Sequence, residues 1–135
     1  MEDTFIKFET AKLASIIGFN EKCLKEYNED GIIVSCHYSY VTNSDIDYGC
    51  FCTVCTQSEL QTWLRNNYHI HINPQPYLES TIPGDTDITG YYVGPIYNKY
   101  GKEIGGIEDS NYHSYEEALE KGLQSALGFI NHIKI

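Results

Sequence analysis

The sequence predicts an α+β fold, in which a single mostly antiparallel sheet of four to five strands carries about three helices packed on one side. Apolar residues recur at helical spacing in three stretches, and runs rich in β-branched and aromatic residues lie between them. The helices interrupt hairpins and do not alternate strictly with strands, which favours antiparallel pairing. A chain of 135 residues suits one core, so residues 1–135 are expected to form a single α+β domain.

Two helices are predicted to begin with a capping box, in which a hydroxyl and a carboxylate accept hydrogen bonds from backbone N–H groups of the first turn. Thr56 and Glu59 open the first of these helices, which is expected over 57–67. Ser114 and Glu117 open the second. The buried side of the first helix is expected to hold Leu60, Trp63 and Leu64.

The third predicted helix, over 9–17, is expected to end at Gly18, which suits a left-handed cap. The last helix continues to Ile130 along one apolar stripe. Gly122 and Gly128 interrupt that helix, and we interpret them as points of close packing on the sheet.

Five runs are expected to form strands: 32–41, 48–54, 69–73, 90–97 and 103–107. The first two are predicted to pair through the turn 42–45, and the last two through 98–102. Pro74 and Pro76 are expected to end the third strand, and 78–89 to form an exposed loop whose role the sequence leaves unknown.

The charge of the chain bears on its partners. Nineteen acidic residues against nine basic ones leave a net charge of −10, so nucleic acid is not expected as a partner, because affinity for phosphates depends on Lys and Arg. No run approaches the ~20 apolar residues of a membrane span, and the N-terminus lacks the pattern of a signal peptide. We therefore expect no membrane contact and a cytoplasmic location.

The five cysteines are an odd number, and three of them lie close together at Cys50, Cys52 and Cys55. Together with His37 or His71 they have the ligand types of a zinc site. Strong zinc patterns, however, contain two pairs of closely spaced Cys or His ligands, and this chain has one such group. Buried or free thiols are therefore the favoured interpretation, and the three cysteines are weak metal candidates.

Candidate ligand-binding side chains occur in two regions. Arg65 is the only arginine and is able to hold a phosphate or carboxylate, whereas on a helix it is more often a solvated polar side chain. His69 and His71 are two residues apart on a predicted strand, so their side chains lie on the same face. This face is either part of a ligand site or the polar side of a half-exposed strand. Tyrosines near Gly90 are able to stack on a flat ligand or on one another. The predicted contact set is Arg65, His69, His71, Tyr91, Tyr92 and Tyr97.

Three stretches carry a resemblance to a known group of proteins. They are Thr56–Arg65 running into His69–Ile72, Phe8–Ala14 with Gly18–Phe19, and Tyr115–Leu123. Together they resemble small uncharacterised proteins of Bacteroidetes genomes and of the bacteriophages and prophages that infect these bacteria. The resemblance covers about a third of the chain and implies a phage or mobile-element setting in a bacterial host cell. It implies no activity and no catalytic residue.

No catalytic motif or dinucleotide fingerprint is present, which favours a non-enzymatic protein without a cofactor. The leading hypothesis is a phage counter-defence protein that binds and sequesters a small nucleotide-type immune signal. The first alternative is an acidic protein-binding inhibitor of a host defence protein or of a nucleic-acid-binding groove, and the second is a small zinc protein. A homodimer is compatible with exposed strand edges, and the sequence does not identify the ligand or the target.

Overall fold

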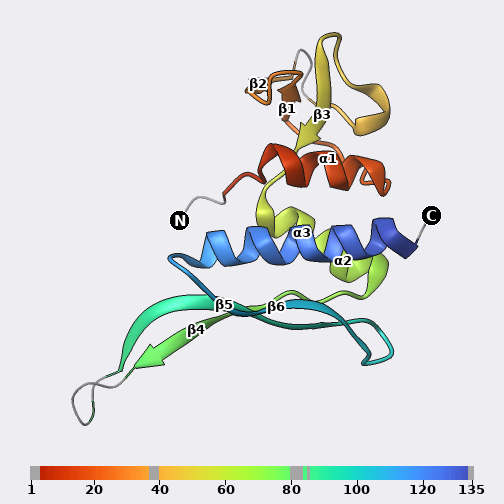
Figure 1. The fold of residues 1–135 in the computed structure, drawn as a ribbon. Helices are drawn as coiled ribbons and strands as arrows, with labels where there is room; N and C mark the ends of the chain where they lie inside the picture. Colours follow the sequence, from red (N-terminus) through yellow and green to blue (C-terminus); the bar gives the residue numbers. More distant parts are fainter. Residues whose placement is uncertain (1–3, 37–39, 80–83, 85, 134–135) are drawn as a thin grey trace.

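The computed structural model describes residues 4–36, 40–79, 84 and 86–133, and places its elements in four layers (Figure 1). Along the chain the elements are α1 (Phe8–Ile16), β1 (Lys25–Asn28), β2 (Ile33–Ser35), the 3-10 turn η1 (Asn43–Asp45), β3 (Cys50–Val54), α2 (Gln57–Tyr68), β4 (Pro74–Glu79), β5 (Asp87–Tyr97), β6 (Glu103–Tyr112) and α3 (Tyr115–Ile133). The first sheet, β2-β1-β3, lies against α1, and the second sheet, β4-β5-β6, lies against α3. Helix α3 contacts α1, α2 and all three strands of the second sheet, so it is the central element.

The predicted α+β class, the antiparallel pairing and the three helices are confirmed. All strand pairs are antiparallel, but the strands divide into two three-stranded sheets, where the sequence predicts one. The helices therefore lie between sheets. The buried side chains form one hydrophobic cluster that includes residues of both sheets and of all three helices.

The first sheet differs from the prediction in its pairing. β1 precedes the turn Asn28–Gly31 and forms the hairpin with β2, and β3 pairs with β1, whereas the predicted partner of 48–54 was 32–41. The turn itself has the expected chemistry, since the side chain of Asn28 accepts hydrogen bonds from the N–H groups of Asp30 and Ile32. β1 was missed because Lys25 and Glu26 interrupt any apolar alternation.

The second sheet begins later than predicted. Residues 69–73 alternate between exposed and buried, as expected, but they form only one isolated bridge, from His71 to Tyr97. The strand β4 instead begins at Pro74 and runs to Glu79, so the prediction that the prolines end a strand is wrong. β4 is an edge strand, where a missing N–H is tolerated. The hairpin through 98–102 is confirmed, with Gly101 at φ +75°.

Helix starts follow the capping signals. Thr56 and Glu59 form both hydrogen bonds of a capping box at the start of α2. At α3 the Ser114 hydroxyl accepts from the Glu117 N–H at 3.1 Å, while the Glu117 carboxylate accepts from the His113 N–H. Helix α1 has no local cap, because its N-cap residue is Lys7 and the Lys7 side chain makes no capping hydrogen bond.

A carboxylate from the far end of the chain supplies the contact that α1 lacks. Glu120 of α3 is 2% exposed and accepts a hydrogen bond from the Lys7 N–H at 3.0 Å. It also accepts from the Thr10 hydroxyl on α1 and from the Gln57 side-chain amide on α2 at 2.9 Å. Two buried donors, from α1 and α2, and the partly buried N–H group that precedes α1 therefore meet on one side chain of α3.

Gly122 allows α3 to approach the second sheet closely. A Cβ atom at this position would lie 2.6 Å from Ile72 Cγ2 and 3.3 Å from Val93 Cγ1. At Gly128, further along α3, nothing lies within 4 Å of such an atom. The interpretation of glycine as a close-packing residue thus holds for Gly122 and not for Gly128.

The two glycines make a matched test. Gly122→Ala is expected to lower the free energy of unfolding by about 1–3 kcal/mol, because the methyl group overpacks the contact with Ile72. Gly128→Ala is expected to raise it by up to about 1 kcal/mol, because alanine has the higher helix propensity and meets no obstacle. Urea unfolding of both variants measures the difference, and stabilisation by both substitutions would contradict the close contact.

Glu120→Ala is expected to lower the free energy of unfolding by about 3 kcal/mol, because the buried Thr10 hydroxyl and Gln57 amide and the partly buried Lys7 N–H all lose this acceptor. The free energy of unfolding of Glu120→Gln is expected to lie between the values for Glu120→Ala and the wild type, since glutamine retains one accepting oxygen. Urea unfolding measures both variants. Substitution of the exposed Glu9 by alanine is the control, and it is expected to change the free energy of unfolding by less than about 0.5 kcal/mol. A loss below about 1 kcal/mol for Glu120→Ala would show that the helices do not depend on this carboxylate.

Candidate functional site

A groove with a volume of about 650 Å³ lies between one face of α2 and the segments that precede β1 and η1. Helix α2 contributes the longer wall, and residues 19–22 with Thr42 contribute the other. The lining residues are Phe19, Asn20, Glu21, Lys22, Thr42, Ser58, Glu59, Thr62, Trp63, Asn66 and Asn67. The groove lies along the face of α2 that carries Ser58, Thr62 and Asn66, whereas Leu60 and Leu64 are buried in the core.

The walls of the groove are held by several contacts. The ring of Trp63 meets the buried ring of Phe19 edge-on, with centroids 5.2 Å apart. The Phe19 carbonyl accepts from the Asn43 side-chain amide at 2.7 Å, and the Asn20 side-chain oxygen accepts from the Ser44 N–H at 2.8 Å. The segment 19–22 is therefore tied to residues 43 and 44, and the groove is preformed.

The groove offers an aromatic edge and many neutral hydrogen-bonding groups. Its amide and hydroxyl side chains are Asn20, Thr42, Ser58, Thr62, Asn66 and Asn67. Its charged residues are two acids and one lysine, and the Glu59 carboxylate also accepts the N–H of Thr56 in the cap of α2. Neither histidine nor cysteine is among the described lining residues. This set suits binding of a small polar molecule that has a flat apolar part.

Of the predicted contact residues, only Arg65 borders this groove. It is exposed on α2, and its guanidinium lies 3.4 Å from the hydroxyl of Thr62, which lines the groove. A ligand that extends past Thr62 would therefore meet the guanidinium.

The two predicted histidines have different environments. His69 is the left-handed residue that ends α2, with φ 57°, and its N–H donates to the Arg65 carbonyl at 3.1 Å. This conformation ends a helix with hydrogen bonds to its last carbonyls. His71 is exposed and pairs with Tyr97 at the margin of the second sheet. The two residues are thus not a pair on one strand.

The predicted tyrosines lie on both faces of the second sheet. Tyr91 meets Tyr115 of α3, with ring centroids 6.2 Å apart. Tyr92 contacts Tyr77 of β4 at 4.7 Å, and Tyr97 is 47% exposed. The structure therefore brings His71 near Tyr97 but does not assemble the predicted set at one pocket.

The cysteine cluster is divided between two environments. Cys52 and Cys55 are buried in the core, and Cys50 is half-buried beside the Glu26 carboxyl group. Burial raises the pKa of both Cys50 and Cys52 to about 11, which keeps the sulfur atoms protonated and weakly reactive at neutral pH. In the part of the chain that the structure describes, no group of three or more His, Cys, Asp or Glu side chains is arranged to hold a metal ion. His37 lies outside the described residues.

Sequence reasoning missed the groove, although one signal for it was present. Ser58, Thr62 and Asn66 recur every four residues on α2 beside Trp63, which makes a polar stripe with one aromatic member. The sequence predicts this helix over 57–67, whereas α2 continues to Tyr68, so Asn66 and Asn67 lie within it. The opposite wall comes from residues about forty positions earlier, and no local pattern predicts that contact.

A buried acid lies under the segment that carries Thr42 and η1. Glu26 on β1 has an exposed fraction of 0%, and one of its oxygens accepts from the Asp47 N–H at 2.9 Å. The other oxygen has no hydrogen bond of acceptable geometry in the described structure. Burial, and secondarily the nearby Asp47 carboxyl group, raise the pKa of Glu26, while the Asp47 N–H and the Cys50 thiol act in the opposite direction.

The raised pKa predicts a pH-dependent effect of Glu26→Gln. As pH rises through the ordinary pKa, the unfolded chain releases a proton that the folded chain retains, so Glu26 lowers stability increasingly until its own higher pKa is passed. Glu26→Gln has no carboxyl group at this position, so it does not undergo this loss of stability. Its melting temperature relative to the wild type is therefore expected to rise as the pH increases above about 4, as measured by circular dichroism. The exposed Glu29→Gln is the control, and a difference that does not change with pH would contradict the prediction.

No helix in the described residues is both long and apolar enough to cross a membrane. Comparison of the chain with protein-family models, with curated proteins and with solved structures finds no match. The groove is therefore interpreted from its own geometry.

Proposed function

We propose that the protein acts by binding a small ligand of the nucleoside or nucleoside monophosphate class in the groove beside α2. The observation that carries this proposal is the preformed groove itself, which joins the ring of Trp63 to a set of neutral amides and hydroxyls. Its volume of about 650 Å³ is in the range of small-ligand sites. A base stacked on or against an aromatic ring, with its polar edge on amide groups, needs these group types.

The charges near the groove limit the number of phosphate groups on the ligand. Glu21 and Glu59 line it together with a single Lys22, and Arg65 lies at its margin. A phosphate in the groove has Lys22 as a cationic partner, and one that extends past Thr62 has Arg65, whereas a triphosphate would also meet the two carboxylates. The charges thus support a nucleoside or a monophosphate in preference to a polyphosphate.

Sequestration is the form of activity that this site supports best. The described lining contains no thiol or imidazole that would serve as nucleophile or general base, and hydrogen bonds to Asn43 and Ser44 hold the wall formed by residues 19–22. The phage setting implied by the sequence resemblance makes a nucleotide-type immune signal the proposed target. The acidic-inhibitor alternative retains the net charge of −10 as its support, and the zinc alternative retains only the cysteine spacing.

Trp63 is the only tryptophan of the chain, so its fluorescence reports on the groove directly. Titration with nucleosides, nucleoside monophosphates and nucleoside triphosphates is expected to give a saturable change for one of the first two classes. Calorimetry should show the same ligand to bind with heat. Asn66→Ala is expected to weaken binding by about fivefold to tenfold, the effect of losing one hydrogen bond, and Lys22→Ala is expected to weaken binding of a monophosphate by a similar factor and to leave a nucleoside unaffected.

Tyr97→Ala and His71→Ala are the matched controls, because both residues are exposed on the second sheet and outside the lining. They are expected to bind as the wild type does. If these two variants lost binding and Lys22→Ala and Asn66→Ala did not, the ligand-binding site would lie on the second sheet and not in the groove. Absence of any saturable signal across the panel would reject the proposed ligand class.

A further inference from the structure

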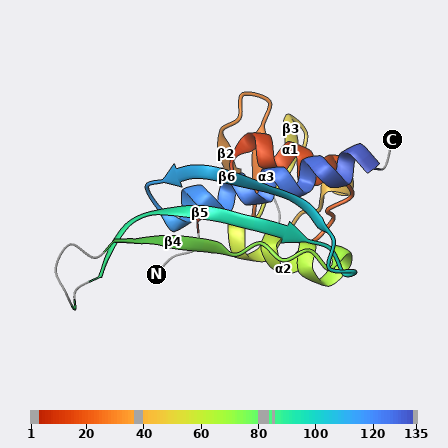
Figure 2. The same cartoon turned by 60° about the horizontal axis from the view of Figure 1, so that its bottom comes forward.

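The second sheet has one face against α3 and another face, here called the outer face, that no described helix or strand covers (Figures 1 and 2). Val93 and Pro74, which are paired across β5 and β4, are buried on the α3 side. Their neighbours Gln75 and Tyr92 therefore point outward, since side chains alternate along a strand. Tyr77 contacts Tyr92 and shares this face.

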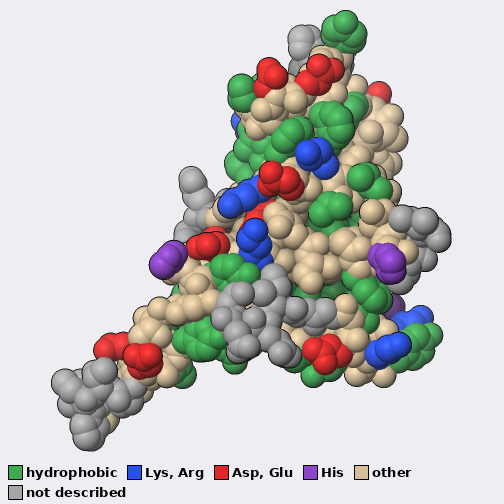
Figure 3. All heavy atoms as spheres, in the orientation of Figure 1, with side chains coloured by type: hydrophobic (Ala, Val, Ile, Leu, Met, Phe, Trp, Pro, Cys, Tyr) green, Lys and Arg blue, Asp and Glu red, His purple; other side chains and the backbone are tan. Residues whose placement is uncertain are grey.

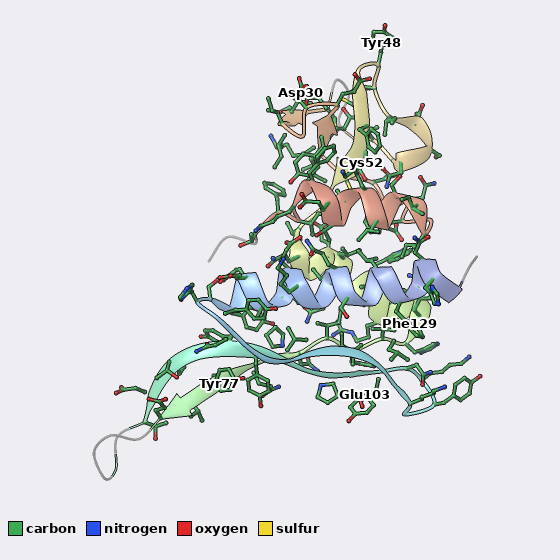
Figure 4. All side chains as sticks on the ribbon, viewed as in Figure 1. Asp30, Tyr48, Cys52, Tyr77, Glu103 and Phe129 are labelled. Atoms are coloured by element: carbon green, nitrogen blue, oxygen red, sulfur yellow. The ribbon has the colours of Figure 1, made fainter. Side chains whose placement is uncertain are left out.

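The outer face continues with aromatic and polar side chains toward the β5–β6 turn. His71 and Tyr97 are paired and exposed, whereas their neighbours Ile72 and Ile96 are buried. Glu103 is paired with Tyr97, and Figure 4 shows Glu103 on the side of the sheet away from α3. The outer face is thus rich in tyrosine, a residue type enriched at protein interfaces.

The two ends of this sheet carry opposite charges. Glu79 and Asp87 are directly opposite each other on β4 and β5, and like charges in that position are destabilising unless a cation is near. At the other end, Lys99 and Lys102 of the β5–β6 turn outnumber Glu103. Figure 3 shows acidic side chains beside the free end of the β4–β5 hairpin and Lys or Arg side chains at the opposite corner of the sheet.

We propose that the outer face binds a second copy of the chain, with the strands of the two copies running in opposite directions. A two-fold axis in the plane of the interface and perpendicular to the strands places the Glu79–Asp87 end of each copy on the lysine end of the other. An axis parallel to the strands would place acid on acid. The charge distribution therefore selects the first arrangement, in which tyrosines pack at the centre.

Further features favour binding of the second copy to the outer face and not to a strand edge, and they indicate that the dimer is weak. Pro74 and Pro76 remove two N–H donors from β4, which makes strand addition at that edge unfavourable. The strands have 6, 11 and 10 residues and are spaced by about 4.8 Å, so the face they form is at the small end of specific interfaces. The net charge of −10 on each copy also opposes association.

Sedimentation equilibrium over a roughly hundredfold range of concentration tests the proposal, which rests on residues outside the ligand groove. The wild type is expected to shift from monomer to dimer. The double reversals Glu79→Lys with Asp87→Lys, and Lys99→Glu with Lys102→Glu, are each expected to weaken dimerisation at least about tenfold, because each puts like charges at both ends. An equimolar mixture of the two variants is expected to restore dimers, since the ends are then complementary again.

Glu29→Lys with Asp30→Lys is the control, because it changes the net charge by the same amount at the β1–β2 turn. Figure 4 shows Asp30 at the far end of the molecule from the second sheet. This control is expected to dimerise at least as well as the wild type. A monomeric wild type throughout the range, or a dimer that neither reversal weakens, would overturn the proposal, and so would a mixture that remains monomeric.

Discussion

The carboxylate of Glu120 sets the arrangement of the three helices. It accepts from the backbone N–H of Lys7 at the start of α1, from Thr10 one turn later and from the Gln57 amide at the start of α2. Gln57 in turn donates to the Glu116 carbonyl on α3, and Gln124 donates to Thr10. The partial positive charge at the start of α1 favours an anion at this position. A buried carboxylate without these donors would be strongly unfavourable, so the helices are required to meet here.

Other parts of the structure follow from this meeting point. Helix α3 is buried by α1 on one side and by the second sheet on the other, and Gly122 allows the sheet to approach. Because the start of α2 is tied to α3, the side of α2 that carries Leu60 and Leu64 faces the core, and the side that carries Trp63 and Asn66 is left to form the groove with residues 19–22. The same layering leaves one face of the second sheet open.

Local signals predicted those elements that depend on local hydrogen bonds. The capping box at Thr56 and Glu59, the Ser114 cap and the turn at 98–102 all involve partners within four residues, and each is present as expected. β1 was missed because its charged residues have tertiary partners. Glu26 is buried and accepts from the Asp47 N–H, a contact that no alternation of apolar residues reveals. The strand predicted at 69–73 had the right burial but lacked a partner strand along its length.

The sequence by itself determined the α+β class, the three helices with their starts, the β5–β6 hairpin and the burial of alternating isoleucines. Arg65, one of the six predicted contact residues, lies beside the groove, and its role as a ligand contact stays a prediction. Only the tertiary structure decided that the strands form two sheets, that His69 ends a helix, and that residues 19–22 meet α2. The physical reason is that capping and turn formation involve neighbouring residues, whereas sheet pairing, the Glu120 contacts and the groove join residues separated by tens of positions through burial and hydrogen bonding.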